Sequence, residues 1–465
     1  MSLRLERGQD STGRRVSIGQ LLDGVLGPDS QIRITAFDGS SAGADDAPYS
    51  LHLANERGLS YLLTAPGELG LARAYVAGDL NVTGTHPADP YDFLAHLEDH
   101  VTLPKPSVKA AVELVRNTGV RNLRPPQPPP QEVPPQWRRT VHGLRHSKTR
   151  DAEAIHHHYD VSNTFYEWVL GPSMTYTCAC YPTLDATLEE AQANKYDLVA
   201  RKIALKPGMR LLDVGCGWGG MVRHAAKHYG VKALGVTLSE QQASWGQQAI
   251  EKAGLSGLAE IRHLDYRDVP ETGFDAVSSI GLTEHIGMRQ LPAYFEFLLG
   301  KLQPEGRLLN HCITRPDNTE PAVRQRGFIN RYVFPDGELE GPGYLISLMH
   351  DTGFEVRHEE NLREHYAKTL AAWGENLDAH WKEAVAEVGE GTARVWRLYM
   401  AGSRLGFDRN HIQLHQVLGA KLTESGVSGM PLRPDWDVRT VTEAAAAPDS
   451  GNGHHAAAGR DSALT

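Results

Sequence analysis

The sequence is poor in cysteine, and this scarcity excludes two kinds of protein. Its 465 residues include four cysteines, Cys178, Cys180, Cys216 and Cys312. They are too few and too scattered for the disulfide framework of a small secreted domain. Cys178 and Cys180 lie close together in the chain, but no second pair completes a zinc site. We therefore expect a protein of a reducing compartment that holds no metal.

Long apolar runs and an excess of positive charge are also missing. No segment approaches the roughly 18–20 apolar residues that cross a bilayer. The first residues, MSLRLERGQDSTGRR, lack the apolar core of a signal peptide. The net charge of −10 gives no global basic field that would attract nucleic acid. The sequence predicts a cytoplasmic protein without a nucleic-acid partner, and any contact with a membrane is expected to be peripheral.

Composition divides the chain into five segments. Residues 1–15 are polar and are expected to be loose. Residues 16–123 mix strand-like and helical patterns, which predicts a smaller α+β N-terminal domain. Residues 124–136, RPPQPPPQEVPPQ, form a proline-rich linker, because proline fits neither a helix interior nor a central strand. Residues 137–437 make the larger domain, and the tail 438–465 has so little to bury that we expect disorder.

The larger domain alternates strand and helix patterns from about residue 185. Strand-like segments occur at 209–220 (ending in a glycine loop), 231–239, 259–266, 274–280 and 306–313. Helical patterns separate most of them, which predicts an α/β fold with a parallel, doubly wound sheet. The stretch 362–424 is expected to be mostly helical and to form a helical lid or C-terminal region.

A glycine-rich loop follows the first of these strands. In DVGCGWGG, Gly215, Gly217 and Gly219 stand at alternate positions before a helical pattern at 221–229. Such a loop lets the backbone approach a ligand at the carboxyl edge of a sheet. The glycines alone would also suit a dinucleotide-binding oxidoreductase. With Asp213 ahead of them and a further turn and strand downstream, the whole resembles the class I, Rossmann-like S-adenosylmethionine (SAM) methyltransferases.

This resemblance implies where the cofactor would bind. Most class I methyltransferases end their second strand in an acid that holds the ribose hydroxyls, whereas GVTLSEQQ places Thr237 there. The Thr237 hydroxyl and the neighbouring backbone at Leu238, helped by Gln242, could replace that acid. Asp265 or Tyr266, after the third strand, would lie near the adenine.

An ordered series of motifs resembles one family more closely. EAIHHHYDVSNTFYEWVLGPSMTYTCACY at 153–181 is followed by GCGWGG, GVTLSEQQ, EHIG, LLNHCIT and HYAKTLAAW. The series is similar to that of the cyclopropane-fatty-acid synthases over about 153–420. LGLARAYVAGDLNVTG at 69–84 resembles part of the extra N-terminal domain of the phospholipid-acting members. The expected substrate is therefore an acyl chain of a membrane phospholipid, modified at the inner face of the membrane.

The chemistry that this family resemblance implies is methyl transfer from SAM to a cis alkene. The transfer leaves a carbocation in the acyl chain, and a base must then remove a proton. The implied base is a bound bicarbonate. Its ligands, carried over to this sequence, would be Cys178, Glu284, His311, Tyr366 and the carbonyl group of Ile280. Glu284 follows the apolar strand FDAVSSI, where ligands bind in open α/β sheets. Tyr176 and Thr177 would touch the methionine part of SAM.

Several of these residues also have an ordinary structural interpretation. A single carboxylate after a strand, such as Glu284, often caps a helix, and Cys178 could be a small buried hydrophobe. Tyr366 and Trp373 share a helix face and could pack in a core or line a substrate tunnel. The adjacent histidines at 156–158 resemble a metal cluster, but adjacent residues do not share a face. The basic run 137–150 could be a solvated surface or could dock on anionic phospholipid.

The product depends on the fate of the carbocation. Proton loss from the new methyl with ring closure gives a cyclopropane, whereas a hydride shift before that loss gives a methylene branch. The family often has an aromatic residue just before the glutamate, where this chain has Leu282 and Thr283. This variant resembles actinobacterial enzymes that make 10-methylene stearate, the precursor of tuberculostearic acid. We expect that product from an oleoyl chain, with a smaller Thr283 reshaping the pocket around the cation.

Alternatives remain open on the sequence alone. Cyclopropane formation on the same substrate is the first, and a small-molecule methyltransferase or a non-catalytic lipid carrier are rival classes. A methylene product would need a separate reductase to become a methyl branch. A homodimer is suggested only by the family resemblance.

Overall fold

The computed structural model describes residues 16–27, 29–84, 90–101, 120–133, 162–321 and 327–436. The expectations for the N-terminal residues 1–15, the basic run 137–150, the histidines at 156–158 and the tail 438–465 fall outside these ranges, so they stay predictions.

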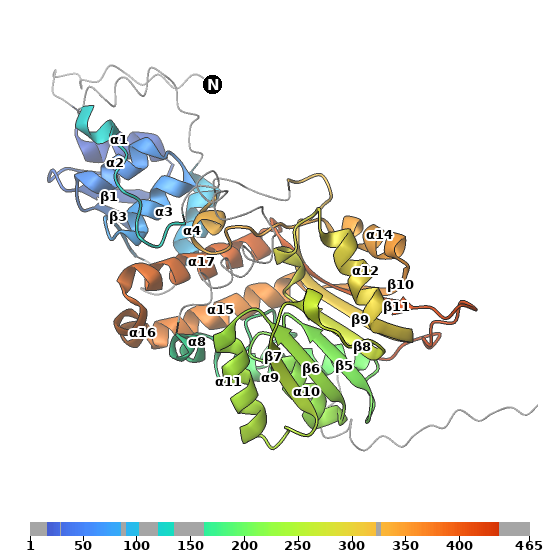
Figure 1. Ribbon diagram of the computed structural model, residues 1–465. Coiled ribbons are helices and arrows are strands. Elements are labelled where there is room, and N and C mark those ends of the chain that lie inside the picture. Colours follow the sequence, from blue (N-terminus) through green and yellow to red (C-terminus); the bar gives the residue numbers. More distant parts are fainter. Residues whose placement is uncertain are drawn as a thin grey trace, which may run out of the picture.

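A seven-stranded sheet in the order β10-β11-β9-β8-β5-β6-β7 organises the larger part of the chain (Figure 1). Its strands are β5 (Arg210–Val214), β6 (Lys232–Thr237), β7 (Ala259–His263), β8 (Phe274–Ile280), β9 (Leu302–Thr314), β10 (Phe354–Asn361) and β11 (Gln413–Lys421). The five strands from β7 to β9 pair in parallel, as predicted. Strand β11 runs antiparallel to both β9 and β10. The sheet is therefore mixed, and the prediction of a wholly parallel sheet is wrong at this edge.

The stretch 362–424 is mostly helical, as predicted, but it also contains strand β11, which was not predicted. Three helices fill this stretch only as far as Asp408: α15 (Arg363–Ala379), α16 (Trp381–Val388) and α17 (Glu390–Asp408). The segment QLHQVLGAK then inserts between β9 and β10, where Leu414–Ala420 are all buried. A short apolar run cannot be assigned to helix or strand by its periodicity alone. Pairing with strands far away in the sequence decides the outcome here.

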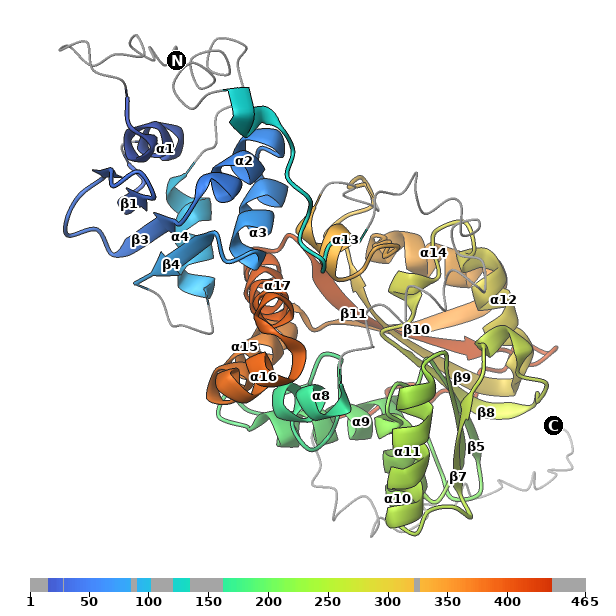
Figure 2. The same ribbon diagram turned by 60° about the vertical axis from the view of Figure 1, so that its left-hand side comes forward.

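Helices cover both faces of the sheet because its strands are apolar on both faces. Leu211 and Leu212 are neighbours in β5, point to opposite faces and are both 0% exposed. One face packs against α9 (Leu188–Lys202), α10 (Gly220–Tyr229) and α11 (Glu240–Lys252). The other packs against α12 (Leu291–Lys301) and α14 (Pro342–Thr352). Figure 2 shows α10 and α11 on one side of the sheet and α12 and α14 on the other.

A helical layer rich in aromatic residues joins the sheet to the N-terminal region. It consists of α8 (Asn163–Leu170), α15, α16 and α17, and the short helix α13 (Phe328–Tyr332) lies beside it. Tyr166, Trp373 and Trp396 belong to its buried core. Across the described ranges, no helix combines the length and apolar character needed to cross a bilayer.

The N-terminal region has its own small sheet and core, which confirms its mixed α+β character. Its elements are α1 (Ile18–Leu26), β1 (Ile32–Ala36), β2 (Ser41–Ala42), β3 (Tyr49–Leu53), α2 (Glu56–Thr64), α3 (Glu68–Val76), β4 (Leu80–Thr83) and α4 (Tyr91–His100). The strand order is β2-β1-β3-β4, with β1 and β3 parallel. Helices α3 and α4 pack against α17 (Figure 2). The N-terminal region is thus attached to the helical layer rather than to the large sheet.

The proline-rich segment is anchored to both parts of the molecule. After a 3-10 turn at Val120–Leu123 it contains neither helix nor strand over its described residues, up to 133. The buried carboxylate of Glu132 pairs with Arg73 of α3 at 2.6 Å and with Arg331 of α13. The Tyr332 hydroxyl donates to the same carboxylate at 3.2 Å. Glu132 of the linker therefore connects α3 of the N-terminal region with α13 beside the helical layer.

Candidate active site

A cavity of about 730 Å³ lies between the sheet, the helical layer and the N-terminal region. Its volume is in the usual range for sites that hold small molecules. At one end its wall includes Thr177, Gly281 and Glu284, and the wall extends as far as Leu51 and Val82 of the small sheet. The cavity therefore connects the carboxyl edge of the large sheet with the N-terminal region.

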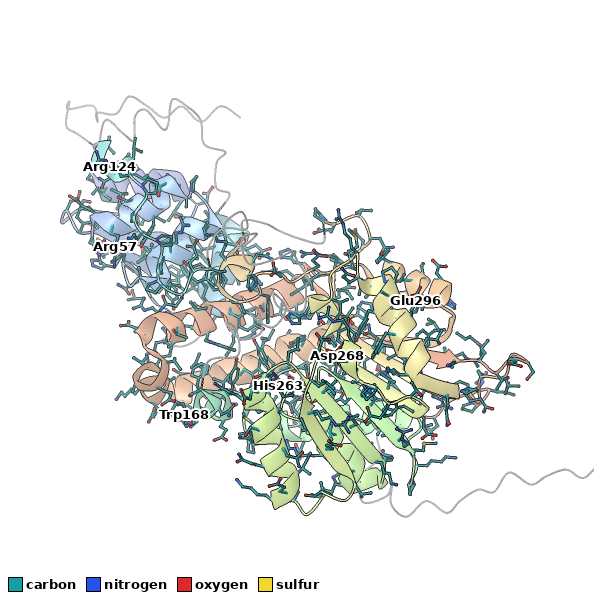
Figure 3. All side chains as sticks on the ribbon, in the orientation of Figure 1. Arg57, Arg124, Trp168, His263, Asp268 and Glu296 are labelled. Carbon is teal, nitrogen blue, oxygen red and sulfur yellow. The ribbon has the colours of Figure 1, made fainter. Side chains whose placement is uncertain are left out.

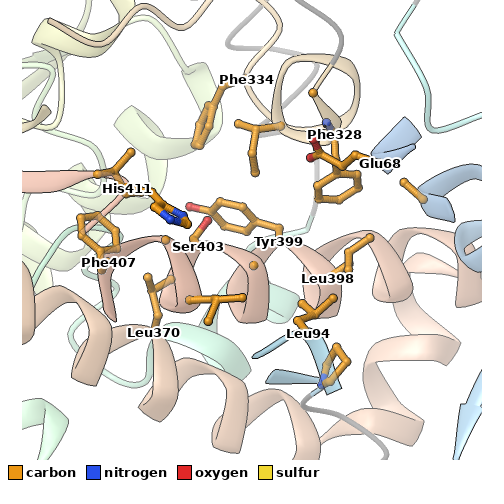
Figure 4. A pocket seen from close by; sticks show the side chains of 18 of the residues that line it. Glu68, Leu94, Phe328, Phe334, Leu370, Leu398, Tyr399, Ser403, Phe407 and His411 are labelled. Carbon is orange, nitrogen blue, oxygen red and sulfur yellow. Dashed lines mark hydrogen bonds between the residues drawn. The ribbon is translucent and has the colours of Figure 1, made fainter. Parts of the chain in front are cut away.

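The lining of this cavity is mostly apolar and comes from distant parts of the sequence. Figure 4 shows Tyr399 and Ser403 on α17, with Leu94 of α4 on one side and Phe328 and Phe334 on another. Few charged groups reach the cavity. Such a lining excludes water and suits a long apolar ligand.

The glycine loop has the conformation that its sequence predicts. Gly215, Gly217 and Gly219 adopt φ angles of 69°, 55° and 76°. These angles lie in the left-handed region, where glycine avoids the steric cost that a side chain would add. A Cβ at Gly215 would also come within 3.1 Å of Leu282, and one at Gly219 within 2.1 Å of Ile261. The loop thus packs directly against the segment that leads to Glu284.

Asp213 is held in place just before this loop. It is 2% exposed, and Ser278 of β8 donates a 2.6 Å hydrogen bond to its Oδ1. Burial raises the pKa of Asp213 to about 7. This hydrogen bond fixes the Asp213 side chain against β8, just ahead of the glycine loop.

The predicted ribose and adenine residues cluster after β6 and β7. Thr237 donates a 2.8 Å hydrogen bond to Gln242 Oε1, so these two side chains lie together as the sequence suggested. The carbonyl group of Leu238 contacts His263 Nε2 at 3.1 Å.

The two residues expected near the adenine follow β7. Asp265 forms an ion pair with Arg267, whose closest nitrogen is 2.6 Å away. Tyr266 packs edge-on against Tyr294 and Phe297. His263 and Asp268, which flank Asp265 and Tyr266, lie at and beyond the end of β7, the edge strand of the large sheet (Figure 3).

Tyr176 and Thr177 reach the same edge of the sheet and line the cavity. Buried Lys195 donates a 2.8 Å hydrogen bond to the Thr177 hydroxyl, and Gln192 donates to its carbonyl group at 2.9 Å. A Cβ at Gly281 would lie 2.9 Å from Thr177 Cγ2. The predicted cofactor residues and the cavity therefore meet around Gly281 and Leu282.

Glu284 presents a free carboxylate oxygen in a buried position. Its Oε1 accepts a 2.7 Å hydrogen bond from the backbone N–H of Ile313. Its Oε2 has no hydrogen-bond partner within the described ranges. Burial raises the pKa of Glu284 to about 7. A buried polar atom without a partner on the wall of an apolar cavity marks a functional site.

The raised pKa of Glu284 predicts a pH dependence of stability. In the unfolded chain this carboxyl ionises near 4.5, whereas in the folded protein it ionises near 7. As the pH rises between these values, ionisation therefore favours the unfolded chain. The folded state loses about 3 kcal/mol over this interval, at about 1.4 kcal/mol per pKa unit.

We expect the melting temperature of Glu284→Gln, relative to the unchanged protein, to rise between about pH 5 and pH 7.5 and then stay level. Glutamine keeps an acceptor for the Ile313 N–H but does not titrate. Differential scanning fluorimetry across this range measures the difference, and Asp213 cancels because both proteins contain it. A difference that does not vary with pH would contradict a buried, titrating Glu284.

The predicted bicarbonate ligands are only partly brought together. Tyr366 lines the cavity with Glu284, whereas Cys178, His311 and Ile280 are buried outside its wall. Cys178 Sγ contacts the carbonyl oxygens of Ala179 at 3.2 Å and Leu362 at 3.8 Å. His311 accepts a 3.1 Å hydrogen bond from Gln416, and its Nε2 has no partner in the described structure.

The two interpretations left open for the pair on α15 each apply to one residue. Trp373 is fully buried in the core, whereas Tyr366 lines the cavity. Thr283 is absent from the wall of the large cavity, and its hydroxyl donates a 2.6 Å hydrogen bond to Asn310. Its expected influence on the pocket around the cation stays a prediction.

Sequence reasoning missed Ile313 and Gln416. Ile313 lies two residues after His311, lines the cavity and holds Glu284. Side chains alternate between the two faces of a strand, so Ile313 shares the face of His311. This alternation could have indicated Ile313 from the sequence. Gln416 gave no signal because its strand was not predicted.

The fold and the site define a class I SAM-dependent methyltransferase. The family model "Mycolic acid cyclopropane synthetase" matches residues 146–417. A probable fatty acid methyltransferase from Mycobacterium tuberculosis is 58% identical over 426 residues, covering 91% of this chain and 99% of the relative.

Solved structures agree with the family match. The cyclopropane synthase MmaA2 from Mycobacterium tuberculosis is 33% identical with a TM-score of 0.55, covering 59% of this chain and 98% of that structure. The mycolic acid cyclopropane synthase CmaA1, complexed with SAH and CTAB, is 32% identical with a TM-score of 0.55, covering 58% of this chain and 97% of that structure. The chain belongs to the mycolic acid cyclopropane synthetase family and is a SAM-dependent methyltransferase.

Proposed function

We propose that this enzyme methylates the cis double bond of an oleoyl chain in a membrane phospholipid and forms a 10-methylene stearoyl chain. The observation that carries the proposal is the large apolar cavity, which reaches Glu284 and Thr177 beside the glycine loop. An acyl chain in this cavity would lie next to the predicted SAM site. The relative named a probable fatty acid methyltransferase supports an acyl substrate.

The residues at the inner end of the cavity suit a carbocation intermediate. SAM, when bound, supplies the methyl group. The apolar wall would keep water away from the cation. The carboxylate of Glu284 would favour positive charge nearby, and the ring of Tyr399 on the cavity wall could add cation–π stabilisation.

Bicarbonate as the proton acceptor fits two unpartnered atoms of the described structure. Glu284 Oε2 can accept the hydrogen of bicarbonate. An N–H group at His311 Nε2 can donate to one of the bicarbonate oxygens. Bicarbonate, when bound, would take the proton that leaves the carbocation. Glu284 and His311 would orient it, with Cys178, Tyr366 and the carbonyl group of Ile280 as the further proposed ligands.

A cyclopropane product is the second candidate. The family model and both solved relatives carry the name of cyclopropane synthases, whereas the most extensively aligned relative above is named a methyltransferase. Both products need the same base, so the geometry at Glu284 does not separate them. A methylene product would pass to a separate reductase. We place the reaction at the inner face of the membrane, where the enzyme would bind peripherally.

An assay with vesicles separates the candidates. The purified enzyme is given SAM, bicarbonate and dioleoyl phosphatidylglycerol vesicles, and the acyl products are analysed by proton NMR because they have equal mass. Exocyclic vinyl protons would support the proposal, and upfield cyclopropyl protons would replace it with ring formation.

Vesicles of a saturated phospholipid provide the control, since they contain no alkene. Methyl transfer to both kinds of vesicle, or to neither, would contradict the proposed reaction. It would then favour a small-molecule methyltransferase or a lipid carrier.

A further inference from the structure

A row of polar side chains crosses the sheet behind His311. Glu360 of β10 pairs in register with Gln416 of β11, and Gln416 pairs with His311 of β9. Directly paired residues in neighbouring strands project to the same face of a sheet. Lys202 of α9 reaches this row from the helix above it. Gln416, His311 and Lys202 are at most 1% exposed, so their polar groups depend on one another.

The hydrogen bonds in this row have a fixed direction. Lys202 Nζ donates to Gln416 Oε1 at 2.8 Å and forms an ion pair with Glu360. A lysine ammonium group is only a donor, so the amide oxygen of Gln416 must face Lys202. The amide nitrogen of Gln416 therefore faces His311 and lies 3.1 Å from His311 Nδ1. The other side of the same amide nitrogen faces Cys180 Sγ at 4.0 Å.

This direction determines which nitrogen of His311 carries the proton. Because Gln416 donates, Nδ1 must accept, and the proton of a neutral ring must lie on Nε2. Burial lowers the pKa of His311 well below its ordinary value, so the ring is neutral. Nε2 is the atom that has no partner within the described residues. The network thus leaves one buried N–H group available to an acceptor.

We infer that Lys202 and Gln416 are positioning residues that hold His311 in its Nε2–H tautomer, so that the ring donates a hydrogen bond to the anion that serves as base. This inference deepens the proposed function and rests on it for the identity of the anion. Neither residue needs to touch the substrate, because both act through His311. An uncharged donor is useful beside a carbocation, since it holds an anion without adding positive charge.

The tautomer can be measured without any substrate. Protein labelled with ¹⁵N in its histidine rings is studied by long-range ¹H–¹⁵N NMR, and the His311 signals are assigned by their loss in His311→Gln. We expect an unprotonated Nδ1 and a protonated Nε2 in the unchanged protein. A protonated Nδ1 there would overturn the inference, whether or not the enzyme proves active on phospholipid.

The variant Gln416→Glu tests the consequence of the network. An ionised carboxylate at this position only accepts, so His311 must turn to the Nδ1–H tautomer to donate to it. The KM for bicarbonate should rise by about 10- to 100-fold, the range that outer partners of metal-bound histidines contribute. The KM for SAM should stay unchanged. Gln413→Glu makes the same substitution at the start of β11, away from His311, and should alter neither constant.

The outcomes separate the inference from the proposed function. A switched tautomer with an unchanged KM for bicarbonate would overturn the inference while methyl transfer continues. Activity that needs no bicarbonate would refute the proposed anion and leave the tautomer measurement standing. If Gln416→Glu does not fold, the tautomer of the unchanged protein still decides whether the network works as inferred.

Discussion

Replacing Glu284 with glutamine is expected to reduce methylation of the acyl chain by about 10²–10⁴-fold, the contribution of a positioned acid–base group. Glutamine keeps the shape of the side chain and an acceptor for the Ile313 N–H. It replaces the unpartnered Oε2 with an amide group, which can no longer accept the hydrogen of bicarbonate. It also removes the negative charge that would favour the carbocation. Transfer of the methyl group from labelled SAM to dioleoyl vesicles measures the loss.

The matched control for this variant is Glu338→Gln. Glu338 lies close to Glu284 because its backbone N–H donates to the Glu284 carbonyl group at 2.9 Å. Its own carboxylate accepts a 2.7 Å hydrogen bond from the Met288 N–H and does not line the large cavity. We expect this variant to stay active and both variants to bind SAM normally by calorimetry. Near-normal activity of Glu284→Gln would remove Glu284 from the mechanism.

The sequence predicted those parts of the site whose structure depends on residues close by in the chain. The glycines at 215, 217 and 219 were predictable because a loop that approaches a ligand needs their conformational freedom, and all three have positive φ angles. Glu284 was predictable as a polar residue at the end of a buried strand. Both signals lie within a few residues of the group that they concern.

The parts that were missed depend on contacts between distant segments. Gln416 belongs to β11, whose strand character comes from its place between β9 and β10 and not from its own pattern. The direction of its amide group is set by Lys202 on α9. The cavity has a similar origin, since Leu51 of the small sheet and Tyr399 of α17 become neighbours of one space only in the folded chain. No local periodicity encodes such an arrangement.

Filling the cavity at Ser403 is expected to block the substrate without disturbing the cofactor. Ser403 lies on α17 and lines the cavity near Tyr399 (Figure 4). The indole of Ser403→Trp would occupy space that we assign to the acyl chain. We expect methylation of phospholipid to fall by at least about 10²-fold, because even small displacements of a bound substrate cost that much. Affinity for SAM, measured by calorimetry, should not change, since the glycine loop lies at the edge of the large sheet.

Two variants show whether the effect at Ser403 comes from its bulk. Ser403→Ala removes the hydroxyl group without filling the cavity and should keep its activity. Ser244→Trp adds the same indole to the exposed side of α11, where Ser244 contacts only Gln248 at 3.4 Å among its side-chain hydrogen bonds in the described structure. Retained activity in Ser403→Trp would show that the acyl chain binds elsewhere. Loss of activity in Ser403→Trp alone would place the acyl chain between α17 and the N-terminal region, and would make that region part of the substrate site.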